Sequence, residues 1–304
     1  LPAATITWNP VDDVQVRGGF SKTITRPQFR ELTPAIFIDD ATDLAYRGNP
    51  FLRNTRIDNY DVRAEYYFGR SRFVTLGGFY KTLDGPIEEA IDRDLGGFEF
   101  VSFINAPSAK LYGFEFEFEN TWPVSDLVDW NSMSTKDLVF KTNYTWSTSK
   151  VSNQGDVSTS ALNPLTRTVD EQVLPGSSVF EDGRALQGQS RHLFNLQIGV
   201  EDVEAESKAT ILVNWASSRI RQVELVLGVN DVVPRVIEEP PVTLDFVWSR
   251  RFERLGGMWQ IGLEVRNILG DDYNASQTFP DGSVTQYDVY DLGRKISASL
   301  KREF

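Results

Sequence analysis

Residues Tyr112 to Glu119 read Tyr-Gly-Phe-Glu-Phe-Glu-Phe-Glu, and this run limits the folds open to the chain more than any other segment. In a β-strand, neighbouring side chains point to opposite faces. That alternation separates an aromatic set from an acidic set: Phe114, Phe116 and Phe118 against Glu115, Glu117 and Glu119. Three carboxylates on one face cannot enter a dry core without a large desolvation cost. We therefore expect the glutamate face to line a wetted, polar lumen and the phenylalanine face to meet an apolar phase.

Alternation with a period of two residues recurs along the whole chain. It predicts about eleven strands, near residues 2–8, 13–26, 57–68, 71–83, 108–122, 136–150, 188–201, 207–219, 241–253, 257–269 and 284–304. Many of them exceed ten residues, which is long for a globular strand but suits a tilted strand that crosses a bilayer. On the same pattern, Glu264 and Arg266 are predicted to face the lumen as well.

The connections between these strands alternate in length. Short ones, such as Asp202–Glu206, follow long ones, such as 27–56 and 151–187. Outer-membrane barrels show this pattern because their periplasmic turns are short and their extracellular loops are long. The predicted fold class is therefore all-β, a transmembrane antiparallel β-barrel meander. A soluble β-sandwich adhesion domain is the less favoured alternative, because a sandwich has no reason to keep the alternation in phase.

Composition excludes several classes of function. The chain has no Cys and a single His, so thiol chemistry, Fe–S clusters and a His-based metal site are not expected. A net charge of -12 argues against a nucleic-acid partner, because phosphates attract a basic surface. No Gly-x-Ser-x-Gly elbow accompanies His192. We expect no catalytic residue, no metal, no cofactor and no enzyme activity.

Several short motifs, in order, resemble the C-terminal barrel of TonB-dependent receptors, in the subfamily typified by Xanthomonas and Caulobacter receptors. These motifs are Thr25-Arg-Pro-Gln-Phe29, Arg47-Gly-Asn-Pro-Phe-Leu52, Asn59-Tyr-Asp61, Glu65-Tyr-Tyr-Phe68, Phe79-Tyr-Lys81 with Pro86-Ile87, Val265-Arg-Asn-Ile-Leu269 with Tyr273, and Gly293-Arg294 with the terminal Phe304. No single motif is decisive, but the ordered set covers nearly the whole chain.

The resemblance implies a 22-stranded barrel in the outer membrane of a Gram-negative bacterium, plugged by an N-terminal globular domain. Residues 1–304 would then be the last half of that barrel, which agrees with the odd strand count, since single-chain barrels normally have an even number. Such receptors import scarce nutrients with energy from the TonB complex. The partners implied are the plug domain and TonB, contacted through regions outside this sequence, a small nutrient ligand, and outer-membrane lipid with lipopolysaccharide. A passive porin-like channel, which would lack a plug, is the alternative function.

Residues in the long connections are the candidates for contact with a nutrient, either a carbohydrate or an iron chelate. The candidates are Phe37, Arg47, Phe51, Arg53, Phe98 and Phe103. Loop packing is the default role for each aromatic residue, and turn formation is favoured for Arg47-Gly-Asn-Pro50. The long connections 27–56, 84–107, 150–187, 219–241 and 270–283 hold 22 acidic and 11 basic residues. An acidic vestibule repels anions, so a neutral or cationic ligand is predicted.

The chain ends on an alternating segment whose one face holds Ile296, Ala298, Leu300 and the terminal Phe304. The resemblance implies that this face is an outer-membrane assembly signal, read by the barrel-assembly machinery. Edge-on pairing of an exposed strand gives the physical basis for such recognition. An ordinary closing strand with an aromatic residue at the membrane interface is the alternative interpretation.

Overall fold

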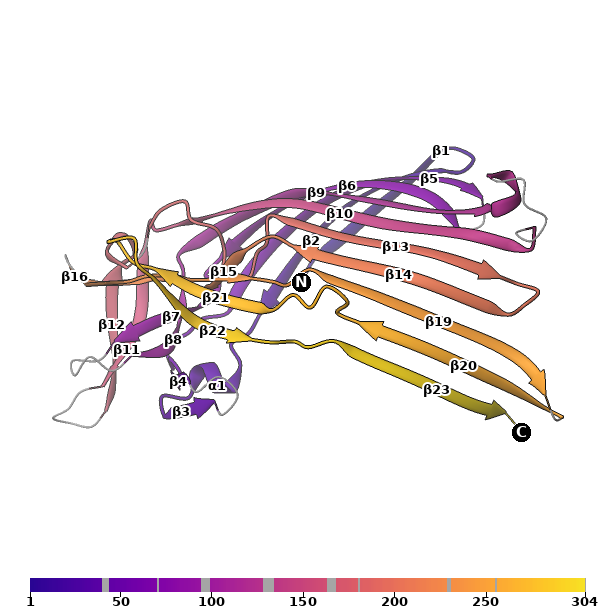
Figure 1. Cartoon of the computed structure of the whole chain (residues 1–304). Coiled ribbons are helices and arrows are strands. Elements are labelled where there is room, and N and C mark those ends of the chain that lie inside the picture. Colours follow the sequence, from indigo (N-terminus) through magenta and orange to yellow (C-terminus); the bar gives the residue numbers. More distant parts are fainter. Residues whose placement is uncertain are drawn as a thin grey trace.

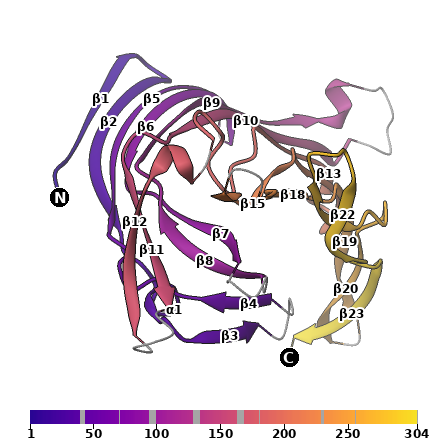
Figure 2. The ribbon, with the colours of Figure 1, turned by 90° about the vertical axis from the view of Figure 1, so that its left-hand side faces the viewer.

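One large curved sheet dominates the computed structural model, which describes residues 1–39, 44–69, 71–93, 99–127, 134–162, 168–179, 181–228, 231–254 and 256–303. Its eleven strands pair antiparallel with their neighbours in chain order: β1 (Ala3–Val11), β2 (Val14–Thr25), β5 (Thr55–Gly69), β6 (Arg72–Asp84), β9 (Ser108–Pro123), β10 (Lys136–Ser152), β13 (His192–Asp202), β14 (Ser207–Ala216), β19 (Thr243–Arg254), β20 (Gly257–Arg266) and β23 (Lys295–Glu303). The long strands lie side by side (Figure 1), and the sheet curves around strands of the smaller sheets such as β7 and β8 (Figure 2). β1 and β23 form its two edges.

The predicted fold class is confirmed, because each of the eleven predicted strands overlaps one strand of this sheet. The last strand requires a correction. Residues 284–304 were expected to form one strand, but Val284–Tyr290 (β22) belongs to a different sheet from β23. Between them the Asp291 carboxylate accepts a hydrogen bond from the Gly293 N–H at 2.6 Å, and Gly293 has φ +62°. That turn interrupts an alternation that continues on both sides of it.

The remaining strands gather at one end of the sheet, the end reached by the long connections (Figure 1). Four small sheets form there among the described residues. Two of them have four strands each, in the orders β3 (Ile36–Asp39), β4 (Leu44–Arg47), β8 (Glu99–Asn105), β7 (Ile87–Arg93) and β15 (Arg219–Gln222), β18 (Val236–Glu239), β21 (Tyr273–Thr278), β22. The other two are the pairs β11 (Asp156–Leu162) with β12 (Val169–Pro175) and β16 (Leu225–Gly228) with β17 (Asp231–Val233). The described helices are short: α1 (Phe29–Leu32), η1 (Val124–Asp126) and η3 (Gly176–Ser178). No helix among the described residues is long and apolar enough to cross a bilayer.

We call the described residues at this end that lie outside the eleven-stranded sheet the loop layer; they belong to residues 26–39, 44–54, 85–93, 99–107, 153–162, 168–179, 181–191, 217–228, 231–242 and 267–294. Its main hydrophobic core contains Ala90 from β7 and Ile104 from β8, both fully buried. Ala109 of β9 and Val151 of β10 belong to the same core. The loop layer therefore packs against the inner face of the large sheet, where Figure 2 shows β7 and β8 inside the curve.

Candidate functional site

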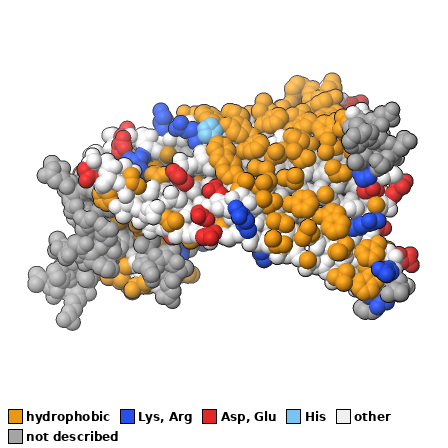
Figure 3. Space-filling model, in the orientation of Figure 1, with side chains coloured by type: hydrophobic (Ala, Val, Ile, Leu, Met, Phe, Trp, Pro, Cys, Tyr) orange, Lys and Arg blue, Asp and Glu red, His pale blue; other side chains and the backbone are white. Residues whose placement is uncertain are grey.

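The two faces of the large sheet differ sharply in chemistry. Phe116 lies in register with Leu76 on one side and Tyr144 on the other, and all three share one face. Phe116 is 36% exposed and Leu76 57% exposed, so this apolar face has no protein layer over it. Figure 3 shows the result as a broad hydrophobic surface over the large sheet. A surface of that extent marks contact with a membrane or a partner.

The opposite, inner face is polar. Glu115 and Glu117 share it with Ala109, because residues two apart on a strand point the same way. Glu119 is also on this face and lies 2.8 Å from the ammonium group of Lys141. Glu264 forms an ion pair with Arg266 on β20.

Arg63 is the centre of a charged cluster on the inner face. Its guanidinium lies 3.1 Å from the Glu65 carboxylate and 3.2 Å from the Glu117 carboxylate. Glu65 is almost buried and also accepts a hydrogen bond from the Tyr67 hydroxyl. An open pocket of about 250 Å³ lies beside the cluster and is lined by polar groups that include Arg63, Glu115 and Glu117. Such a surface can hold water, a polar solute or a charged protein segment.

The six candidate ligand contacts fall into different environments. Phe103 is 1% exposed and packs with Tyr46 and Val101, so it is a core residue of the loop layer, which corrects the expected ligand contact. Phe37 stacks on Tyr46 at 5.4 Å between ring centroids. Arg53 is exposed. Phe98 lies outside the described residues.

The Arg47-Gly-Asn-Pro50 turn holds the loop layer together. Arg47 places its guanidinium 4.1 Å from the Phe100 ring centroid and donates to the Ser160 carbonyl at 2.9 Å. Asn49 is fully buried and donates to the carbonyls of Phe103 and Ser158, while Phe51 donates its backbone N–H to the Asn49 side chain. This segment has a structural part to play, which limits how far Arg47 could turn toward a ligand.

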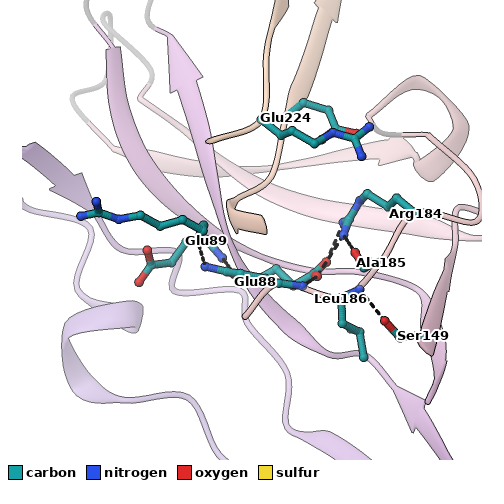
Figure 4. Close-up of polar contacts among 10 residues, drawn as sticks. Glu88, Glu89, Ser149, Arg184, Ala185, Leu186 and Glu224 are labelled. Atoms are coloured by element: carbon teal, nitrogen blue, oxygen red, sulfur yellow. Dashed lines mark hydrogen bonds and ion pairs between the residues drawn. The ribbon is translucent and has the colours of Figure 1, made fainter. Parts of the chain in front are cut away.

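A buried ion pair that sequence reasoning missed joins two long connections (Figure 4). The side chain of Arg184 is 0% exposed and that of Glu88 2% exposed, and the two guanidinium–carboxylate contacts measure 3.0 and 2.6 Å. Glu88 also accepts the backbone N–H of Gln187 at 3.0 Å. The partners lie 96 residues apart, so no local pattern could have indicated their pairing.

A second network joins the four strands of the sheet β15-β18-β21-β22. Arg221 donates to Asp288 at 2.7 Å and to the Tyr273 hydroxyl at 3.2 Å. Burial raises the pKa of Tyr273 far above its usual value, and the hydrogen bond to Glu238 raises it further. Burial likewise raises the pKa of Glu89, against the opposing charges of Arg30 and Arg221. Among the described residues, no group of three or more His, Cys, Asp or Glu side chains could hold a metal ion.

The single histidine has a structural environment on the apolar face. Its ring stacks between Tyr144 and Trp215, with centroid distances of 6.1 and 6.2 Å, and its Nδ1 lies 2.7 Å from the Tyr144 hydroxyl. On the last strand, Ile296, Ala298 and Leu300 lie in register with the apolar residues Val265, Leu263 and Ile261 of β20. Ile296 and Leu300 are 72% and 63% exposed. Phe304 lies outside the described residues.

Known proteins share both the sequence pattern and the fold of this chain. The model of a protein family described as "TonB dependent receptor-like, beta-barrel" matches residues 1–297. Among solved structures, a mutant of the ferric enterobactin receptor from Pseudomonas aeruginosa, in complex with enterobactin, is 16% identical with a TM-score of 0.55; the match covers 98% of this chain and 40% of that one. The outer membrane transporter YddB from Escherichia coli is 12% identical with a TM-score of 0.55, over 95% of this chain and 38% of that one.

These structural matches, at such low identity, show a shared fold. The chain spans about 40% of the length of the solved structures that it matches. No curated protein matches the chain.

Proposed function

Because the chain belongs to the family of TonB-dependent receptor-like β-barrels, we propose that it forms half of the membrane wall of an outer-membrane receptor that imports a scarce nutrient. The family match over residues 1–297 carries the proposal. The exposed apolar face and the charged inner face of one long sheet support it, because a barrel wall needs lipid on one side and a polar lumen on the other.

In this proposal, residues 1–304 supply the last eleven strands, and a plug domain and the TonB-contacting segment belong to other parts of the receptor. The plug would lie against the inner face, where Glu115, Glu117, Glu119, Glu264 and Arg266 are available to it. A charged inner wall suits that partner, because ion pairs at a wet interface can be broken and remade at modest cost.

Energy dependence is the test that separates an active receptor from a passive porin. The full-length gene would be expressed in cells that lack competing receptors, and nutrient uptake would be measured with and without TonB. We expect saturable uptake that stops when TonB is deleted or the proton gradient is collapsed. Uptake that rises linearly with concentration and ignores TonB would support the porin-like channel instead.

For the nutrient, we propose a neutral or cationic molecule, which favours a carbohydrate over an anionic iron chelate. The excess of acidic over basic residues in the long connections supports this choice. Ion pairs such as Arg184–Glu88 leave that excess unchanged, because each removes one charge of either sign. The acidic residues can steer a charged ligand only close to the protein surface, since the Debye length is about 8 Å in physiological salt.

Uptake of neutral oligosaccharides and anionic ferric chelates should be compared side by side in the same cells. Preferential, saturable uptake of the oligosaccharide is the expected result. Tight uptake of the anionic chelate alone would contradict the charge argument and would leave the barrel assignment untouched. Arg53, which is exposed, is the first residue to change in that case.

The last strand is proposed as the site that the barrel-assembly machinery recognises, through Ile296, Ala298, Leu300 and Phe304. The exposed edge and apolar face of β23 support this role, because an unpaired strand edge can add to another sheet. Replacing Phe304 with Ala should lower the amount of receptor in the outer membrane while its synthesis is unchanged. Normal accumulation of that variant would count against the signal.

A further inference from the structure

Two lysines lie directly opposite each other on the apolar, outer face of the large sheet. Lys110 of β9 is in register with Lys150 of β10, and both side chains are exposed. Within the part of the chain that the structure describes, neither ammonium group has an ion-pair partner. Like charges placed directly opposite on neighbouring strands destabilise a sheet. The pair would therefore gain stability from an anion held between the two ammonium groups.

A third lysine, Lys22, lies in the same row of residues that are in register across the sheet, and it can be compared with the Lys110–Lys150 pair. Lys22, Asp58 and Thr82 continue the row across β2, β5 and β6 to Lys110. Lys22 is neutralised there, because its ammonium group lies 3.2 Å from the Asp58 carboxylate. The uncompensated positive charge is thus confined to the β9–β10 end of the row.

Aromatic side chains fix the level of this lysine pair relative to a bilayer. Tyr112, which is in register with Tyr80, follows Lys110 by two residues on the same face, a distance of about 7 Å along the strand. Trp146 lies further along, 6.4 Å from Tyr112 and 5.7 Å from Phe114 between ring centroids. Tyr and Trp concentrate where a membrane meets water.

The lysines therefore lie just beyond the apolar band, on the side of the long connections, where lipid headgroups would be. Figure 3 shows Lys and Arg side chains beside the single His at that border. His192 is in register with Trp146, which lies on β10 and precedes Lys150 on the same face, so the His marks the level of Trp146. Flexible lysine stems can lie along apolar surface while their charges reach the headgroup layer.

We propose that Lys110 and Lys150 form a binding site for the phosphate groups of lipopolysaccharide in the outer leaflet. The inference rests on the proposed function, which places the long connections on the cell surface and hence this border in that leaflet. A phosphate carries the charge that the lysine pair lacks, and basic clusters at a membrane border bind anionic headgroups. The aromatic rings next to the lysines supply apolar contact for the acyl chains of the same lipid.

Retention of lipid A by the purified full-length receptor tests the site. Native mass spectrometry would compare bisphosphorylated lipid A with its dephosphorylated form, each added at the same concentration in detergent. The test variant is Lys110→Gln with Lys150→Gln. The matched control is Lys22→Gln, which removes a lysine of the same row that already has an acidic partner.

We expect the double variant to retain bisphosphorylated lipid A roughly tenfold less well, because it loses two positive charges that each attract the anionic headgroup. The Lys22→Gln control should retain it normally, and Lys110→Arg with Lys150→Arg should restore retention. Equal retention by the wild-type receptor and the double variant would overturn the site. So would equal retention of the dephosphorylated lipid, which would assign binding to the apolar band alone. Nutrient uptake by the double variant should persist, so failure of the lipid site and failure of the receptor assignment give different results.

Discussion

Replacing Glu88 with Gln should loosen the loop layer while the large sheet stays folded. The change keeps the size of the side chain but leaves the Arg184 guanidinium charged, buried and without its carboxylate partner. Removing one partner of a buried ion pair typically costs about 3–5 kcal/mol. Glu88 lies on β7 two residues before the core residue Ala90, and the N–H of the core residue Val151 donates to the Arg184 carbonyl. The cost of breaking the pair therefore falls on the opening of the loop layer.

Hydrogen exchange of backbone amides in the full-length receptor measures that opening. The reporters are the N–H of Leu186, which donates to the Ser149 hydroxyl, and the N–H of Val151, which donates to the Arg184 carbonyl. A cost of about 3–5 kcal/mol corresponds to exchange that is roughly a hundredfold to a few thousandfold faster, because about 1.4 kcal/mol is a factor of ten. Amides in the middle of β9 and β10 should keep their protection.

The double variant Glu88→Gln with Arg184→Met is the matched control. It removes both charges and keeps apolar volume at the buried position, so most of the lost protection should return. Acceleration below tenfold in the single variant would refute the buried-charge argument. Equal exchange in the single and double variants would refute it as well, since the effect would then follow from the loss of Glu88 itself.

Three further predictions concern the sheet and its pH response. Phe116→Arg should lower the free energy of unfolding of the receptor in lipid vesicles by roughly 2–4 kcal/mol, because it places a charge on the lipid face. Urea unfolding measures this change, and an equally stable variant would show that this face does not meet lipid. Gly113→Ala should impair folding, because the added Cβ would lie 2.2 Å from the Trp146 carbonyl oxygen. Gly77→Ala should fold normally, because its added Cβ would lie 3.6 Å from the nearest atom, the Val62 carbonyl oxygen. Similar yields of the two folded variants would contradict this reasoning. Glu89→Gln should stabilise the loop layer at neutral pH, because burial raises the pKa of Glu89 and so makes its charged form costly in the folded state. That advantage should shrink as the pH falls through the raised pKa toward the usual glutamate range, where Glu89 is protonated in the wild type; an advantage in hydrogen exchange that does not vary with pH would exclude this cause.

The strands and their two faces follow from the sequence because both depend on neighbours along the chain. The alternation of Phe114 with Glu115 identifies a strand and separates its faces wherever that strand lies in the fold. The regular spacing of short and long connections then predicts an antiparallel meander. The same local rule also misled the interpretation at the C-terminus, since residues 284–290 alternate as well as 295–303 do, although they belong to another sheet.

The loop layer, in contrast, was decided only by tertiary structure. In the sequence its residues looked like loops, yet β4 pairs in parallel with β8, and Arg184 meets Glu88 from 96 residues away. The sequence made Phe103 a candidate ligand contact with loop packing as its default role, and the structure buries it in the core of this layer. Contacts of this kind depend on which distant segments the curved sheet brings to one end. A pattern with a period of two residues carries no information about them, because it describes only what each residue does relative to the next.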